Sequence, residues 1–286
     1  MKLFIRALGR EAESRAAALS MSRGGETATL YFGGGTPSML SDTHLGRLME
    51  TLDRLVPVDR LDEFSFEANP ATFTEKKVRF WRSLGMTRVS LGVQSLDSGI
   101  LHLLGREHTP AQALHSVEML KNAGMAHINM DLMFAIPGQT LSIWEATLKE
   151  AVSAGTDHIS AYNLTYEEDT EFFRSLLRGE KRQDPDEDAS FFELAEHMLE
   201  AAGMRHYETS NYAREGCLSP HNMAYWKGED YVGIGPGAVS TINGIRYSNT
   251  RDTGAYIRST LENGLPLSEQ EPVTAEDYRL ERIALM

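Results

Sequence analysis

One local pattern occurs four times in this sequence and limits what the chain can fold into. In each case a stretch of helical character ends on a glycine, and an apolar, strand-type stretch follows within about two or three residues. The four closures are Leu84-Gly85-Met86, Ala123-Gly124-Met125, Ala154-Gly155-Thr156 and Ala202-Gly203-Met204. Strands that alternate with helices connect by right-handed crossovers, so the pattern predicts a parallel sheet covered by helices.

Six segments are expected to be the strands of this sheet. They are Thr29–Phe32, Glu63–Glu67, Arg88–Val93, His127–Phe134, His158–Leu164 and Arg205–Thr209. The predicted fold is α/β, a partial (β/α)6 TIM-like barrel. We expect residues 1–180 to form the barrel and residues 181–286 to extend it. In such folds the binding site lies at the C-terminal ends of the strands.

The first of these strands ends in three consecutive glycines, Gly33 to Gly35, followed by Thr36 and Pro37. A glycine run permits a tight turn, and it also lets a ligand approach the main chain closely. Three glycines together favour the second interpretation. The spacing matches neither the phosphate-binding G-x-x-x-x-G-K-[S/T] loop nor the dinucleotide-binding G-x-G-x-x-G motif. The corner is therefore expected to bind a small polar ligand, and a phosphate site is not indicated.

Polar residues follow the other predicted strands at the same point, where each strand ends. The segments are Glu67-Ala68-Asn69-Pro70, Gly92-Val93-Gln94-Ser95, Asn129-Met130-Asp131 and Tyr162-Asn163-Leu164-Thr165. Any one of them is compatible with loop capping, since Asn69-Pro70 is a common turn pair and Thr74 is suited to begin a helix. A carboxylate or amide at each successive strand end instead favours a shared site.

The amino-acid composition of the chain disfavours several classes of binding partner. The 286 residues carry a formal net charge of −13, which disfavours binding to nucleic acid or to anionic lipid. No uninterrupted apolar run is long enough for a membrane span and the N-terminal stretch is not a signal peptide, so we expect a cytoplasmic protein. The single cysteine, Cys217, rules out an intrachain disulfide or an all-cysteine metal cage within this sequence, and a free buried thiol is expected.

Six motifs in order make the sequence similar to a known family. They are GGGTP, EANP, GVQSLD, GREHT, NMDLMFAIPGQT and HNMAYW. The chain resembles the radical S-adenosylmethionine (SAM) family, and within it the oxygen-independent coproporphyrinogen III oxidase-like proteins. The motif from His221 to Trp226 favours the heme chaperone branch, HemW. The resemblance runs from about Lys2 to the C-terminus.

The resemblance implies which residues contact SAM. The glycine corner and Thr36 would hold its methionine moiety, Glu67 would supply an acidic contact, and Asp131 would be the strand-end carboxylate that binds it. The full implied set is Gly34, Gly35, Thr36, Pro37, Glu67, Gln94, Arg106, Asp131 and Thr165. No catalytic residue is assigned.

The family also implies a [4Fe-4S] cluster held by three thiolates in a CxxxCxxC loop. This sequence has no such loop. We expect it to be an internal fragment that lacks the first strand, the cluster segment and a C-terminal helical domain, and therefore to be inactive alone. The alternative is an intact homologue that has lost the cluster.

Three functions fit the resemblance. In the first, a heme chaperone, His221 is an axial ligand of heme iron and Tyr225 with Trp226 lies against the porphyrin; heme-receiving proteins and a second copy of the chain are then the expected partners. A structural histidine in a loop after Pro220 is the alternative for His221. The second function is oxidative decarboxylation of coproporphyrinogen III. The third is a SAM-binding barrel without radical chemistry.

Two positions depart from the family pattern. Ala135 stands where a glycine usually precedes an Ile-Pro pair, which is a small steric change. Val239 stands where relatives commonly carry a histidine, a change expected to alter heme or porphyrin contacts. Neither position belongs to the proposed SAM residues.

Overall fold

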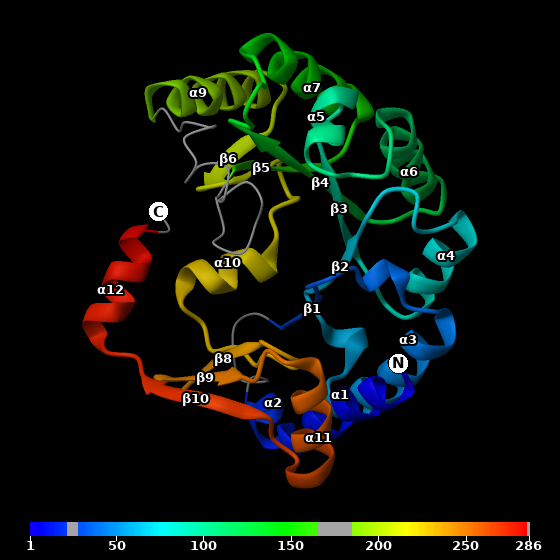
Figure 1. Ribbon diagram of the computed structural model, residues 1–286, viewed down its shortest axis with the longest axis vertical. Helices are drawn as coiled ribbons and strands as arrows, with labels where there is room; N and C mark the ends of the chain where they lie inside the picture. The colour runs from blue at the N-terminus through cyan, green and yellow to red at the C-terminus, as the bar shows by residue number, and fades with distance from the viewer. Residues whose placement is uncertain (22–27, 165–184, 285–286) are drawn as a thin grey trace.

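The structure is a computed structural model that describes residues 1–21, 28–164 and 185–284. Its main feature is a curled sheet of seven strands in the order β1-β2-β3-β4-β5-β7-β6, lined on its outer side by helices (Figure 1). The strands of this sheet are β1 (Thr29–Phe32), β2 (Glu63–Ala68), β3 (Arg88–Gln94), β4 (His127–Phe134), β5 (His158–Asn163), β6 (Arg205–Glu208) and β7 (Asn211–Ala213). Strands β1 to β5 pair in parallel and in chain order, as expected of a partial barrel.

Helices between the strands cover the convex face (Figure 1). They are α3 (Asp42–Leu55), α4 (Glu75–Ser83), α5 (Ser98–Leu103), α6 (Pro110–Asn122), α7 (Leu141–Ala154) and α9 (Pro185–Ala201), with short 3-10 turns η2 (Pro37–Met39) and η3 (Val58–Arg60). Threonine or serine hydroxyls begin several of them; Thr74 accepts from the N–H of Lys77, as its sequence position predicts. A Thr-Pro pair commonly begins a helix, but the α-helix after the glycine corner begins later than Thr36-Pro37. That pair opens only the η2 turn, and Ser41 caps α3.

Side chains alternate between the two faces of the central strands. The apolar members pack outward, as in the contact between Phe66 of β2 and Trp81 of α4, whose ring centroids lie 4.7 Å apart. The polar members, among them Ser90 and Asn129, point inward and bond to one another. The hydrophobic core therefore lies between sheet and helices, and the concave interior of the barrel is polar.

The sixth predicted strand is present as β6, but it is not the next parallel neighbour of β5. Strand β7 lies between them and pairs antiparallel with both. The sheet thus includes strands from beyond residue 181, and the division of the chain at residue 180 stays a prediction.

The C-terminal part of the chain packs back on the N-terminal helix. It contains α10 (Pro220–Lys227), α11 (Thr253–Asn263), α12 (Ala275–Ala284) and an antiparallel sheet of β8 (Val239–Ile242), β9 (Ile245–Asn249) and β10 (Leu267–Pro272). The N-terminal helices are α1 (Lys2–Ser14) and α2 (Ala16–Met21).

A buried carboxylate in α1 forms hydrogen bonds with the C-terminal part of the chain. Glu11 of α1 accepts hydrogen bonds from Arg15, the Asn249 side chain, the Tyr256 hydroxyl and the backbone N–H of Gly235. A buried carboxylate is stabilised only when such donors surround it. The glycine-rich segment Gly233-Ile234-Gly235-Pro236-Gly237 thus serves packing between the barrel and its extension. None of the helices in the described ranges has both the length and the hydropathy of a membrane span.

Ala135, which stands where the family pattern has a glycine, carries backbone strain rather than only the small steric change expected from the sequence. Its φ is 56°, in the left-handed region that glycine adopts without a Cβ penalty. We expect Ala135→Gly to raise the free energy of unfolding by about 1 kcal/mol, or the melting temperature by about 2 °C. Ala146→Gly, at an exposed position inside α7, is the matched control and should lower stability by about 1 kcal/mol. Equal losses in the two variants would contradict the strain argument.

Candidate functional site

A cavity of about 380 Å³ opens at the C-terminal ends of the parallel strands. That volume falls in the range of about 300–1,000 Å³ typical of small-molecule sites. Its lining residues are Tyr31, Gly35, Thr36, Pro37, Glu67, Ala68, Asn69, Ser90, Gly92, Gln94, Arg106, Asp131 and Tyr162. The position agrees with the rule that places binding sites at this edge of a barrel.

Most of the predicted contact residues lie together in this cavity. Seven of them line it: Gly35, Thr36, Pro37, Glu67, Gln94, Arg106 and Asp131. Gly34 lies beside it, since its backbone N–H donates to Glu67 Oε2 at 3.0 Å. Thr165 lies outside the described residues. Their roles toward a ligand stay predictions.

The glycine corner is required for two different reasons. A Cβ on Gly33 would lie 2.3 Å from the Tyr31 ring and 2.7 Å from Glu67 Oε1, so a side chain there would displace these two cavity residues. Gly34 and Gly35 have room but adopt φ of 74° and 61°, which disfavours other residues. The Tyr31 hydroxyl donates to Glu67, so this carboxylate fixes both the corner and the aromatic wall of the cavity.

Asp131 forms the polar floor of the cavity. Ser90 Oγ donates to both of its carboxylate oxygens at 2.9–3.0 Å, and Asn129 Nδ2 donates at 2.7 Å. Burial raises the pKa of Asp131 to about 6, and the charge of Glu67 adds to the rise, while the hydrogen bonds oppose it. Two carboxylates so placed favour a ligand that carries hydrogen-bond donors or positive charge.

A cation faces the same cavity. Burial lowers the pKa of the Arg106 guanidinium, and the nearby charge of Asp131 opposes this. Among the described residues no hydrogen bond of this guanidinium is found, so its fork of donors is available to a carboxylate. Gln94, at the end of β3, adopts φ of 66°, a strained conformation that recurs at ligand sites. The cavity therefore presents acceptors on one side and a fixed cation on the other.

A directional chain of hydrogen bonds runs from Asp131 through the barrel interior. Asn129 donates to Asp131 through Nδ2, so its Oδ1 accepts from His158 Nδ1 at 2.6 Å. Burial lowers the pKa of His158 to about 3, and a neutral ring that donates through Nδ1 accepts through Nε2. The Tyr207 hydroxyl donates to that nitrogen at 2.8 Å. These bonds thus connect the cavity floor to Tyr207 of β6.

His221 lies in helix α10 rather than in the loop considered from the sequence. Its ring stacks on Tyr31 of the cavity wall, with centroids 4.7 Å apart and an interplanar angle of 6°. Its Nδ1 is 2.8 Å from Thr29 Oγ1, and no hydrogen bond to Nε2 is found in the described part of the chain. Burial lowers the pKa of His221, so at neutral pH the ring is in the form that binds metals.

Aromatic side chains continue from His221 along α10. Tyr225 is 42% exposed and meets the His221 ring edge-on at 5.1 Å, and Tyr231 lies 4.6 Å beyond it. The helical spacing of His221 and Tyr225 puts both on one face. The role of this face toward a porphyrin stays a prediction.

Two residues that line the cavity were not predicted from the sequence. Tyr31 and Ser90 lie within strands rather than at their ends, and attention to strand ends passed over them. Asn69 and Tyr162 stand in strand-end segments but were not assigned a contact. These inward-facing residues could have been found from the alternation of polar and apolar residues within the strands. Polar residues occupy every second position in two of them, at Ser65 and Glu67 and at Asn129 and Asp131.

The protein is an α/β partial barrel with a cavity of small-molecule size at the C-terminal ends of its strands, and comparisons with known proteins identify its class. Residues 10–151 match the Radical SAM superfamily. The heme chaperone HemW of Bacillus subtilis is 36% identical over 259 residues, which cover 90% of this chain and 68% of that protein. HemW of Lactococcus lactis is 37% identical over 232 residues, covering 81% and 61%.

Among solved structures, the radical SAM enzyme coproporphyrinogen III oxidase (HemN) from Escherichia coli superposes with a TM-score of 0.81. It is 22% identical, and the match covers 98% of this chain and 67% of that one. This likeness confirms the predicted fold.

The chain belongs to the radical SAM superfamily, and within it to the family of the heme chaperone HemW. It spans about two thirds of the Bacillus subtilis relative and less of the Lactococcus lactis one. Membership of the superfamily implies SAM and a [4Fe-4S] cluster as cofactors.

The residues present fit one of these cofactors and not the other. The cavity offers carboxylates, a guanidinium and an open glycine backbone, which suit the ammonium, carboxylate and hydroxyl groups of SAM. A cluster with three thiolate ligands does not fit, because the sequence holds one cysteine and Cys217 lies at the opposite end of the strands, near His127 and Asp157. No step through the cluster is derived from these residues.

Proposed function

We propose that this chain binds SAM in the cavity at the strand ends and heme through His221, and that it serves as a heme chaperone. The observation that carries the proposal is the stack of His221 on Tyr31, because Tyr31 also bonds to Glu67 in the SAM cavity. One aromatic ring is thus shared by the two sites. Heme bound at His221 would lie beside the SAM cavity rather than inside it.

Complementary charge supports SAM as the ligand of the cavity. Glu67 and Asp131 would accept from its ammonium and hydroxyl groups, and Arg106 would bind its carboxylate. The bare backbone of Gly34 and Gly35 leaves room beside them. SAM supplies a sulfonium centre to this site, and the chain's own residues bind and orient it.

The porphyrin oxidase alternative has less support from this chain. Its named fold neighbour is 22% identical, which shows the fold alone, whereas relatives named as heme chaperones are 34–37% identical. Anaerobic assay of product porphyrin with a homologue that carries the cluster cysteines decides between them. Formation of protoporphyrinogen would favour the oxidase.

The binding of SAM is expected to depend on pH through Asp131. Its pKa is raised to about 6, so the carboxylate is ionised at pH 7 and increasingly neutral below pH 6. A neutral carboxyl loses its charge-assisted bond to SAM, so the affinity should fall about tenfold between pH 7 and pH 5. Calorimetric titration of SAM across this range measures the effect.

Asp131→Asn is the control for this pH dependence. It should bind SAM more weakly at pH 7 and show a flatter profile, because the titrating group is gone. A parent protein whose SAM affinity is the same at pH 5 and pH 7 would contradict the role of Asp131.

A further inference from the structure

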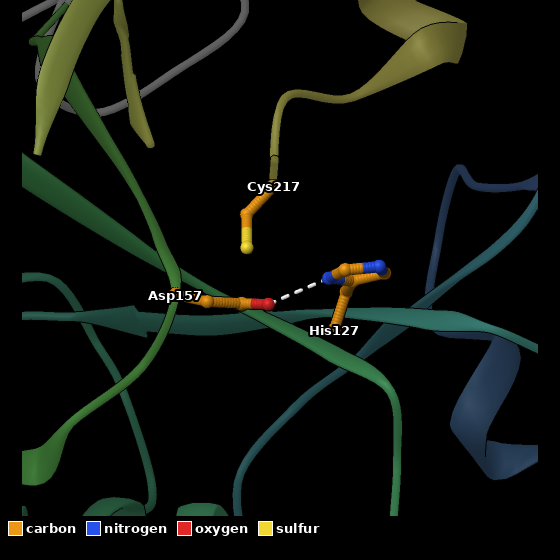
Figure 2. Close-up of side chains that lie close together, drawn as sticks. All are labelled: His127, Asp157 and Cys217. Carbon is orange, nitrogen blue, oxygen red and sulfur yellow. Dashed lines mark hydrogen bonds and ion pairs between the residues drawn. The ribbon is translucent and has the colours of Figure 1, made fainter. Parts of the chain in front are cut away.

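Three potential metal ligands meet at the end of the barrel opposite the SAM cavity. His127 is the first residue of β4, Asp157 directly precedes β5, and Cys217 lies in the loop between β7 and α10 (Figure 2). Their ligand atoms all lie within 4.8 Å of one another. His127 Nδ1 is 2.6 Å from Asp157 Oδ2, and the Cys217 side chain points at this pair (Figure 2).

The three side chains are held from outside the cluster. The second oxygen of Asp157 accepts from the backbone N–H of Ile128 at 2.8 Å, which turns the first toward His127. Arg88 donates to the carbonyl oxygens of Cys217 and Leu218, at 3.0 Å each. Supporting contacts of this kind orient metal ligands in known sites. All three ligand residues are only partly buried, so an ion can reach them from solvent.

We propose that His127, Asp157 and Cys217 bind one divalent transition-metal ion of the Zn²⁺ type. A nitrogen, an oxygen and a sulfur ligand suit an ion of borderline softness, and a tetrahedral ion keeps a fourth position for water. On binding, the Cys217 thiol gives its proton to solvent, and the neutral His127 ring shifts its proton from Nδ1, where it bonds to Asp157, to Nε2. The thiolate and the Asp157 carboxylate then neutralise the two positive charges of the ion.

Two guanidinium cations act on Cys217, those of Arg88 and Arg214. The Nε of Arg88 is paired with the Glu63 carboxylate at 2.6 Å with both side chains buried. The pair is neutral as a whole. The metal-bound site would thus be a neutral group next to a neutral ion pair.

The ion would fasten the segment that leads into α10. Cys217 is three residues before Pro220, where α10 begins, while His127 and Asp157 belong to the central strands. Binding would therefore tie the helix that carries His221 to the base of the barrel. This site is separate from the proposed SAM and heme sites, so its test is independent of theirs.

Cobalt(II) titration of the 286-residue chain tests the proposal. Because Cys217 is the only cysteine, a thiolate-to-cobalt charge-transfer band can arise only from this residue. We expect one equivalent of Co²⁺ to produce the band, Zn²⁺ to abolish it, and both ions to raise the melting temperature.

Cys217→Ser is the decisive variant, since a serine retains the shape of the loop. It should lose the band and bind Zn²⁺ at least tenfold more weakly. His127→Gln should also weaken binding at least tenfold, whereas His115→Gln, whose imidazole is 67% exposed on α6, should leave it unchanged. Absence of the band in the parent, or unchanged Zn²⁺ affinity in Cys217→Ser, would overturn the proposal.

Discussion

Replacing Glu67 with glutamine is expected to weaken SAM binding by about ten- to a hundredfold. The carboxylate accepts hydrogen bonds from the Tyr31 hydroxyl and the Gly34 N–H, and in the proposed function it is also an acceptor for SAM. Loss of a charge-assisted hydrogen bond costs about 1.5–3 kcal/mol, which corresponds to that change in affinity. Calorimetric titration of SAM at pH 7.5 gives the dissociation constants.

Two further variants separate these roles. Tyr31→Phe removes the hydroxyl but keeps the ring, so it should weaken SAM binding by less than Glu67→Gln if the carboxylate contacts SAM directly. Glu50→Gln, at an exposed position of α3, changes the net charge equally and should have no effect. Equal losses in Tyr31→Phe and Glu67→Gln would show that Glu67 acts only by holding the cavity wall.

The sequence predicted the barrel because its local signals agreed with one another. Glycine closures such as Gly85 and Gly155 do lie in the left-handed conformation, with φ of 94° and 66°. The strand ends then converged as parallel geometry requires, which brought Glu67 and Asp131 into one cavity. Local chemistry and the rule for parallel strands were sufficient for this part of the site.

The polar interior of the barrel was not predicted, although a signal for it was present. His158 and Ser160 alternate with Ile159 and Ala161 in β5, which is the period of a strand with one polar face. The prediction from the sequence rested only on the residues at the strand ends, so this alternation was passed over. The chain from Asp131 to Tyr207 also needs β5 and β6 to lie close together, and that arrangement depends on tertiary packing.

Strand β7 had no adequate signal. It has three residues, Asn211 to Ala213, too few for a hydrophobic period to be recognised. Its antiparallel insertion between β5 and β6 is set by pairing partners far away in the sequence, such as His158 opposite Ala213. The cluster of His127, Asp157 and Cys217 was hidden for the same reason, since 90 residues separate its first and last members by their numbers.

Replacing His221 with alanine is expected to abolish the Soret shift that heme shows on binding the parent. The imidazole would be the axial ligand of heme iron. Without it, the neighbouring Tyr225 ring would still contact heme, but no bond to the iron would remain. We expect heme affinity to fall by at least about tenfold. Titration of ferric heme, followed by absorption, measures the shift and the affinity together.

Thr29→Val tests how the ligand is held. Thr29 Oγ1 is the partner of His221 Nδ1, and such a contact fixes the orientation and tautomer that leave Nε2 for iron. This variant should keep the Soret shift but weaken heme binding by about tenfold, while His115→Ala, an exposed histidine on α6, should bind heme as the parent does. An unchanged Soret shift in His221→Ala would remove this residue as the ligand. In that case the stack of His221 on Tyr31 would serve only to support the wall of the SAM cavity.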